Sequence, residues 1–381
     1  MATRKVHFKQ FFESEKAGGV VLLFFTILSL LLANSSFQQR YISFWSSVSI
    51  GGMSIEHWIN DGLMAVFFLL IGLELKREVL VGELSSLKKA SLPVFSALGG
   101  MLVPAAIYSY FNWGLDTIHG FAIPTATDIA FAIGILSLLG KRVPLSLKVF
   151  LTALAVIDDL GAILVIALFY TKTIFWSNLL IALAIFLILL LLNRIKITNL
   201  LVYLVGGIFM WYFMHHSGIH ATITGVLLAL TIPTYKKQKD APALVLQKVL
   251  HYPVPFIVIP LFALANTAIP INNEWDKMLT EPVGIGIISG LLIGKPVGIF
   301  LFTRISIWLN ISEKPKGINW MQLFGVAILA GIGFTMSIFI ALLAFDSERL
   351  INEAKISILM GSLITAFIGL LWLKLSLNRK K

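Results

Sequence analysis

The chain lacks cysteine altogether and has few charged residues. None of its 381 residues is cysteine, which excludes disulfides, thiolate metal sites and cysteine nucleophiles. Only 13% of the side chains are charged, about half the share in a soluble domain. Hydrophobic residues make up 58%, more than one soluble core can bury, and this excludes a disordered chain as well. We therefore expect an all-α membrane protein that crosses the bilayer many times.

Apolar runs separated by polar breaks predict where the chain crosses the membrane. A transmembrane helix needs roughly 20 predominantly apolar residues. The runs are residues 17–34, 61–75, 90–110, 121–139, 145–170, 174–192, 200–214, 218–234, 249–270, 283–303, 320–345 and 354–373. The sequence thus predicts twelve transmembrane helices in a single integral-membrane domain over residues 1–381.

Basic residues in the connecting loops predict the orientation of these helices. Lys and Arg close to helix ends stay in the cytoplasm because their translocation is costly. When successive loops are assigned to alternating sides, one side receives nearly all of them, and the other receives only Arg40, Lys172, Lys277, Arg349 and Lys355. Both termini are therefore expected in the cytoplasm. The first run also resembles a secretory signal peptide, but the alternation requires that it is retained as a helix. Since the basic residues are scattered over short loops, the net charge of +11 does not indicate a nucleic-acid partner.

One non-helical element is predicted between the first two runs. Residues 44–56 alternate polar and apolar side chains around Gly51 and Gly52, which is a signal for a two-residue β-hairpin. A lone hairpin is marginally stable in water. We expect it either to pack on its own chain or to pair with a second copy of the protein.

Four ionisable side chains lie deep within the apolar runs, namely Asp128, Asp158, Asp159 and Lys295, while Asp61 lies at the start of its run and is shallower. A charge at the centre of a membrane helix costs at least about 2.5–3.5 kcal/mol. A membrane carboxylate can simply bond to a neighbouring helix, but several such charges in one protein favour a function.

Asp158 and Asp159 are adjacent in the middle of the fifth run. Consecutive helical residues point about 100° apart, so the two carboxylates cannot both face lipid and are expected to open on a polar cavity. Two neighbouring acids in a low dielectric favour protonation of at least one of them. The pair therefore predicts a site that holds either a proton or a hard cation, which is the simplest basis for exchanging Na⁺ for H⁺.

The fourth run, residues 121–139, is predicted to be an interrupted helix. Pro124 removes a backbone donor, and Thr127 and Asp128 compete for backbone groups. Such breaks are tolerated in a membrane only where the backbone lines protein or water.

The eleventh run, residues 320–345, has a similar weak point from Gly331 to Gly333. The predicted orientation makes the fourth and eleventh runs antiparallel, so like dipole ends of their half-helices would face each other. Asp128 would offset paired N-termini, and Lys295 would offset paired C-termini.

Lys295 also needs an anionic partner, for which Asp158 and Asp159 are the candidates. It lies beside glycines spaced four residues apart, which allow another helix to approach closely: Gly286, Gly290, Gly294 and Gly298.

These segments resemble the NhaA family of bacterial Na⁺/H⁺ antiporters. The resemblance rests on residues 122–134, which include Thr127-Asp128, on 153–162, which include Asp158-Asp159, and on Gly294-Lys295-Pro296. Residues 67–78 and 217–222 extend it over nearly the whole chain. It implies inverted repeats with crossed, interrupted helices four and eleven. It also implies no cofactor, transport of Na⁺, Li⁺ and H⁺, and a homodimer in the lipid bilayer.

The resemblance also assigns roles to single residues. Asp159 matches the main cation-binding aspartate, Asp158 matches the neighbour that pairs with Lys295, and Thr127 and Asp128 match the pair in the broken helix. Residues matching a pH-sensing cluster are Glu74, Arg77, Glu78 and His251, and those matching a dimer contact in the hairpin are Val48, Gly51, Gly52 and Met53. Residues 244–248 depart from the family pattern, which puts pH sensing by the ninth helix in doubt.

We therefore expect an electrogenic antiporter, not an enzyme, that exports Na⁺ from a bacterium across its inner membrane and contributes to pH and sodium homeostasis. One alternative is a Na⁺-coupled symporter of similar architecture, which would need a pocket for an organic solute. Another is an intramembrane aspartyl protease, whose aspartates lie in Tyr-Asp and Gly-x-Gly-Asp contexts. Here the contexts are Thr127-Asp128 and Ile157-Asp158-Asp159, which do not match.

Overall fold

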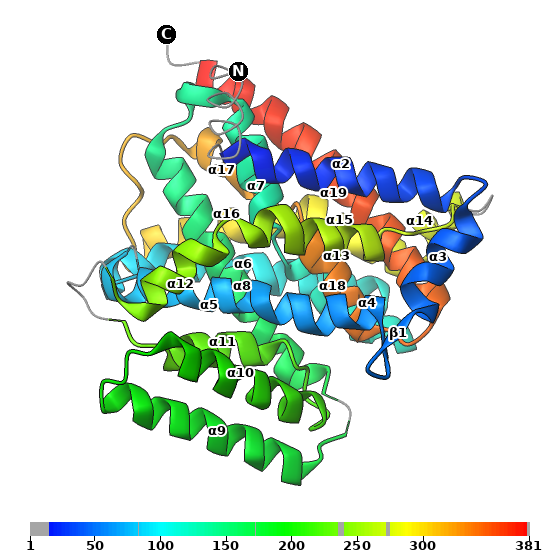
Figure 1. The fold of residues 1–381 in the computed structure, drawn as a ribbon. Helices are drawn as coiled ribbons and strands as arrows, with labels where there is room; N and C mark the ends of the chain where they lie inside the picture. The colour runs from blue at the N-terminus through cyan, green and yellow to red at the C-terminus, as the bar shows by residue number, and fades with distance from the viewer. Residues whose placement is uncertain (1–14, 83, 172, 235–239, 272–274, 379–381) are drawn as a thin grey trace, which may run out of the picture. The chain divides into compact units, whose positions relative to one another are not determined.

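The computed structural model describes residues 15–82, 84–171, 173–234, 240–271 and 275–378. This part of the chain is almost entirely helical (Figure 1). Six of its helices are long and apolar enough to cross a membrane, or up to nine if each of three bent helix pairs is one span. The protein is therefore a mostly helical, multi-pass membrane protein. Part of the basic loop sequence used to predict the orientation, in residues 1–14, 235–239 and 379–381, lies outside the described residues.

Helices occupy all twelve apolar runs. They are α2 (Glu15–Ala33), α5 (Met64–Val81), α6 (Leu87–Phe111), η2 with α7 (Asp116–Thr125 and Ile129–Leu138), α8 (Leu145–Phe169), α9 (Trp176–Arg194), α10 (Leu200–His215), α11 (Ile223–Thr231), α12 with η4 and α13 (Pro242–Leu250, Val254–Val258 and Ile259–Asn266), α15 with η5 and α16 (Pro282–Ser289, Gly290–Gly294 and Lys295–Trp308), α17 with α18 (Trp320–Ala330 and Phe334–Ala344) and α19 (Glu348–Asn378). Short polar side chains start several of them: Ser86 caps α6, Asn199 caps α10 and Asn319 caps α17.

The helices form two compact units. Unit 1 comprises residues 1–38, 86–162 and 266–381, and unit 2 comprises residues 39–85 and 163–265. Unit 1 contains the deep aspartates and Lys295. In unit 2, a buried apolar cluster is built from α5, α9, α10, α11 and α12, and α9 and α10 lie side by side (Figure 1).

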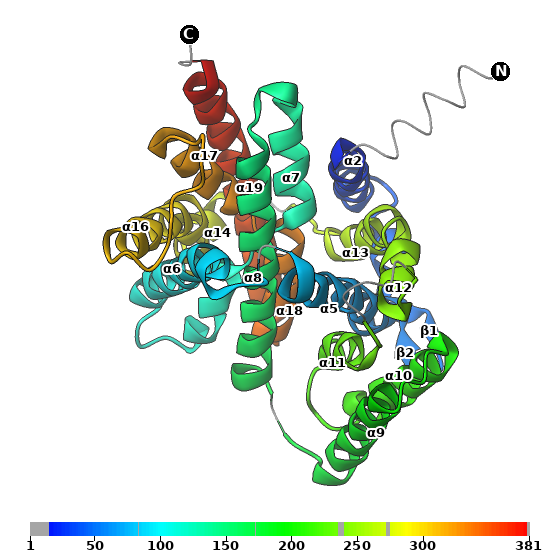
Figure 2. The ribbon, with the colours of Figure 1, turned by 90° about the vertical axis from the view of Figure 1, so that its left-hand side faces the viewer.

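Helices α6 and α16 of unit 1 lie side by side and touch through their backbones (Figure 2). A Cβ added at Gly298 would lie 2.1 Å from the carbonyl oxygen of Gly99, and one added at Gly99 would lie 2.2 Å from that of Gly298. Ser96 Oγ and Thr303 Oγ1 form a buried hydrogen bond of 2.6 Å across the same interface. The glycine stripe thus allows a close helix approach, as its spacing predicts.

The strand pair in unit 2 is shorter than the predicted hairpin. Strands β1 (Ser49–Ile50) and β2 (Met53–Ser54) are antiparallel, and Gly51 and Gly52 both have positive φ in the turn between them. The remaining residues of the 44–56 segment are mainly helical, in α3 (Gln38–Ser47) and α4 (Ile55–His57).

Two local interactions explain this correction. The buried Trp45 packs edge-on against Tyr41 one helical turn earlier, which favours α3. Ser54 accepts a hydrogen bond from the N–H of His57, which starts α4 at the point where the second strand would otherwise continue.

Candidate ion-binding site

The two interrupted helix pairs of unit 1 meet at their breaks. The chain bends by 42° between η2 and α7 and by 44° between α17 and α18. The N–H of Asp128 donates to the carbonyl of Ile332 (2.7 Å), and the hydroxyl of Ser337 donates to the carbonyl of Ile123 (2.7 Å). Each break therefore satisfies backbone groups that the other leaves free, as a membrane interior requires.

Asp128 lies between two helix N-termini. Its Oδ1 accepts a hydrogen bond from the N–H of Phe131 (2.9 Å) and so caps α7. Its Oδ2 accepts from the N–H (3.1 Å) and the hydroxyl (2.6 Å) of Thr335 in the first turn of α18. A carboxylate here offsets the partial positive charge of both helix ends, which is the position predicted for Asp128.

Lys295 pairs with Asp158, a choice that the residue pattern left open and that the family resemblance implies. The Lys295 ammonium lies 3.0 Å from Asp158 Oδ2, and both side chains are fully buried. The ammonium also donates to the carbonyl of Thr125, the last residue of η2. Lys295 therefore places positive charge at a helix C-terminus, where that charge is favourable.

Thr127 links the ion pair to the second break. Its hydroxyl oxygen lies 2.7 Å from Asp158 Oδ2 and 2.8 Å from the carbonyl oxygen of Ala330, the last residue of α17. Carboxylate, hydroxyl and carbonyl oxygens therefore converge in a small volume. Oxygen donors of this kind suit hard cations.

Asp159 follows Asp158 on α8 and is also fully buried. It is close enough to Lys295 to act on that residue electrostatically. Within the described part of the chain, Asp158 Oδ1 accepts no hydrogen bond. The site thus contains two adjacent carboxylates and one ammonium, and a proton or a cation can balance its remaining charge.

Two features of this site escaped sequence reasoning. The π-helical segment η5 (Gly290–Gly294) directly precedes Lys295, and such segments are frequent at functional sites. In the sequence, Gly294 and Pro296 on either side of Lys295 were the signal that could have indicated this π-helical segment. The second is Thr335, whose place just after the glycine-rich break was a signal for a residue that caps the following half-helix.

Of the predicted pH-sensing residues, Glu74, Arg77 and Glu78 lie on α5 in unit 2. Arg77 and Glu78 form an ion pair of 2.9 Å, and Glu74 hydrogen-bonds with Gln247 of α12. Gln247 belongs to the segment that departs from the family pattern. His251 lies just beyond α12, where its ring contacts Tyr252 edge-on.

Sequence reasoning missed Lys76, which also lies on α5. Its ammonium donates hydrogen bonds to three carbonyls at the C-terminal end of α11, those of Ala229, Leu230 and Ile232. Lys76 thus satisfies backbone groups that the end of a helix leaves free.

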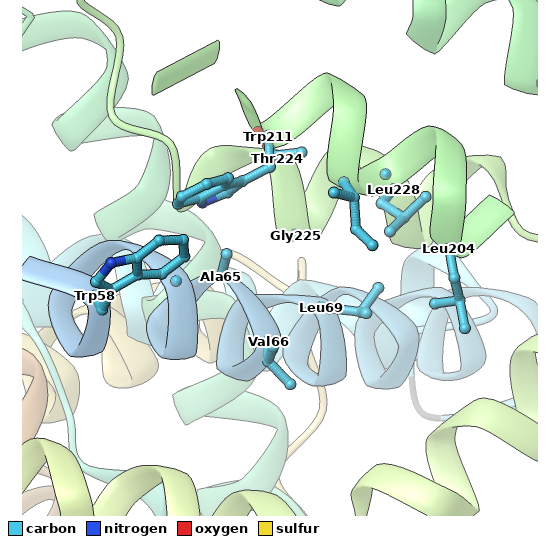
Figure 3. Close-up of a pocket in the computed structure, with 12 residues that line it drawn as sticks. Trp58, Ala65, Val66, Leu69, Leu204, Trp211, Thr224, Gly225 and Leu228 are labelled. Carbon is cyan, nitrogen blue, oxygen red and sulfur yellow. The ribbon is translucent and has the colours of Figure 1, made fainter. Parts of the chain in front are cut away.

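An apolar groove in unit 2 differs from this site in its chemistry. Its volume is about 430 Å³, and residues of η1 (Trp58–Leu63), α5, α10 and α11 line it (Figure 3). Trp58, Ala65, Leu69, Trp211 and Leu228 are among these residues, and none of the lining side chains is ionisable. The groove therefore offers no charged group for a cation.

Comparison with known proteins places the chain in a family. Residues 9–373 match the family model described as Na⁺/H⁺ antiporter 1. Proteins named Na(+)/H(+) antiporter NhaA are similar to this chain along nearly their whole length. Those of Flavobacterium psychrophilum and Cytophaga hutchinsonii are 57% and 58% identical, over 96% and 97% of this chain and 95% and 96% of their own. The relative from Dechloromonas aromatica is 53% identical over 96% of this chain and 95% of its own. The resemblance drawn from the sequence is thus confirmed: the chain belongs to the Na⁺/H⁺ antiporter 1 family.

Proposed function

We propose that the protein exchanges Na⁺ for H⁺ across a bacterial inner membrane. The observation that carries this proposal is the fully buried pair of Lys295 and Asp158 directly beside Asp159. Such a group of charges is costly in a membrane and needs a compensating ion or proton. The names of the relatives support an antiporter and not the symporter alternative.

In this proposal, Asp158 and Asp159 bind one Na⁺ when both are ionised. Because Lys295 bonds to Asp158 in the structure, a bound cation competes with its ammonium for the same carboxylate. Asp159 and Lys295 each release a proton when the cation binds. The released protons together carry more positive charge than the one cation, so the exchange is electrogenic. Li⁺, which is a smaller hard cation, is proposed as a second substrate.

The interrupted helices supply the scaffold on which exposure of this site alternates between the two sides. We propose that the chain is one integral-membrane domain of twelve transmembrane helices, organised as inverted repeats, with both termini in the cytoplasm. In that topology η2–α7 and α17–α18 are the crossed fourth and eleventh helices. The hydrogen bonds of Asp128 and Thr127 to both breaks support the crossing.

Two further assignments remain part of the proposal. Glu74, Arg77, Glu78 and His251 would regulate exchange by pH, and the hydrogen bond between Glu74 and Gln247 links α5 to α12. The turn at Gly51 and Gly52, with Val48 and Met53 beside it, would contact a second copy. Val48 is well exposed, which supports that contact.

The decisive experiment measures cation–proton exchange in inverted membrane vesicles. Asp159→Asn should abolish the pH change that follows addition of Na⁺ or Li⁺, because a neutral amide cannot alternate between a proton and a cation. The matched control is Asp276→Asn, which changes an exposed aspartate on α14 (Trp275–Thr280) and should leave exchange intact. Unchanged exchange in Asp159→Asn would falsify the assignment.

A further inference from the structure

Unit 2 contains a group of metal-ligating side chains that the transport proposal does not use. His57 ends α4, Asp61 lies in the π-helical segment η1 (Trp58–Leu63), and His215 ends α10. Asp61 Oδ2 lies 3.3 Å from His57 Nε2 and 3.1 Å from His215 Nδ1. One ligand atom from each of the three residues lies within 4.8 Å of the others. We infer that this cluster binds a divalent transition-metal ion of the Zn²⁺ class.

The spacing of the three atoms fits a tetrahedral ion. Bonds of about 2.0–2.2 Å to nitrogen and oxygen separate tetrahedral ligand atoms by about 3.3–3.6 Å. Both distances from Asp61 are already near this range. The distance between the ligand nitrogens of His57 and His215 is the one that must change when the ion binds. The side chain of His57 is 48% exposed and is therefore free to rotate.

Aromatic neighbours hold the other two ligands in place. The ring of Trp211 stacks on that of His215 at 5.6 Å and 15°, and the ring of Trp58 stacks on Trp211 at 5.6 Å and 23°. The indole N–H of Trp211 donates to the carbonyl of Asp61 (3.2 Å). Figure 3 shows Trp58 and Trp211 together at one end of the apolar groove. Such supporting contacts orient metal ligands before the ion binds.

The chemistry of the cluster favours a transition metal over the transported ions. Two imidazole nitrogens and one carboxylate suit Zn²⁺ and its neighbours in the first row, whereas alkali cations prefer oxygen. Three protein ligands leave a fourth position for water or an anion. Without metal, the hydrogen bond to Asp61 raises the pKa of His57 above its ordinary value, so a binding ion must displace a proton at acidic pH.

The test uses the purified full-length protein in detergent, with any histidine tag removed, at mildly alkaline pH. Zn²⁺ binding is measured by calorimetry, and Co²⁺ serves as a spectroscopic probe of the ligand set. We expect one site in the wild-type protein and a higher melting temperature with Zn²⁺. His57→Gln, Asp61→Asn and His215→Gln should each weaken binding at least tenfold.

His216→Gln is the matched control. This neighbouring histidine directs Nδ1 to the carbonyl of Tyr212 (2.8 Å), so its removal should leave the affinity unchanged. Absence of Zn²⁺ binding in the wild type, or unchanged binding in the double variant His57→Gln/His215→Gln, would overturn the inference.

The melting temperature without metal and the rate of Na⁺/H⁺ exchange show that each variant is folded. If His215→Gln is unfolded, the half-exposed His57 carries the test instead. A Co²⁺ spectrum without nitrogen ligation would equally refute the site.

Discussion

Replacement of Asp128 by asparagine tests whether its negative charge joins the two interrupted helices. Asparagine keeps the size of the side chain, and its oxygen can still accept the hydrogen bond from Phe131 that caps α7. Its amide group, however, would face the N–H and the hydroxyl of Thr335, both of which now donate to Asp128 Oδ2 at 3.1 and 2.6 Å. Asp128→Asn therefore removes both charge-assisted hydrogen bonds to α18 and leaves the link to α7. The hydroxyl of Thr335 can still accept one neutral hydrogen bond from the amide group, but the N–H of Thr335 is left facing another donor.

The expected magnitude follows from the two hydrogen bonds to a charged group that are lost and the one neutral hydrogen bond that can replace them. Hydrogen bonds to a charged group contribute about 1.5–3 kcal/mol each and a neutral one about 0.5–1.5 kcal/mol, so Asp128→Asn should lower the free energy of unfolding by about 2–5 kcal/mol. Thr335→Val removes the hydroxyl bond and leaves the backbone N–H, so it should cost about 1.5–3 kcal/mol. Because both variants remove the hydroxyl bond, the double variant should cost less than the sum of the two.

The assay is chemical unfolding of the purified protein in detergent, with Thr335→Ser as the variant that retains the hydroxyl. A loss in Asp128→Asn no larger than that in Thr335→Val would refute the reasoning. That result would mean that Asp128 is protonated in the folded protein and does not act as a charged cap.

Three other substitutions test separate contacts. Gly298→Ala places a Cβ 2.1 Å from a backbone oxygen of α6, which cannot move away as a side chain can, so it should lower the free energy of unfolding by about 1–3 kcal/mol. The control is Gly19→Ala, whose Cβ would have its nearest neighbour 3.5 Å away. Equal melting temperatures of the two variants would contradict the close approach. Lys76→Met removes the donor from the end of α11 and should cost about 1–3 kcal/mol in chemical unfolding, so an unaltered transition would argue against the cap. Lys295→Met leaves Asp158 buried without its cation and should lower the free energy of unfolding by about 3–5 kcal/mol. The double variant Lys295→Met/Asp158→Asn should recover most of that stability. A double variant as unstable as Lys295→Met alone would disprove the pairing.

The helices were predictable because the membrane restricts the backbone. Each crossing segment must satisfy its own hydrogen bonds, so apolar runs identify helices with little ambiguity. Elements outside those runs were harder. The helices α3 and α14 lack a long apolar run, and the segment around Trp45 alternates like a strand although it is helical. π-Helical segments such as η5 were missed because one additional residue in a turn leaves the hydrophobic pattern nearly unchanged.

The site was predictable where charge was involved and obscure where it was not. Asp128, Asp158 and Lys295 are costly in a membrane, so their presence alone indicated a role. Thr335 carries an inexpensive hydroxyl that many membrane helices contain, and its role appeared only through its contact with Asp128. His57 and His215 are far apart in the sequence and come together through tertiary folding, which no periodicity indicates.

The backbone contact between Gly99 and Gly298 has a consequence for how the protein moves. At these two glycines no side chain separates the backbones of α6 and α16, so the helices interlock closely and resist sliding past each other. They should travel as one body, and Lys295, one helical turn before Gly298, should travel with them. A movement that separates the Lys295 ammonium from Asp158 must then be a displacement of α8 relative to α6 and α16, or a reorientation of the lysine side chain. Cross-linking α6 to α16 should therefore leave the rate of exchange intact.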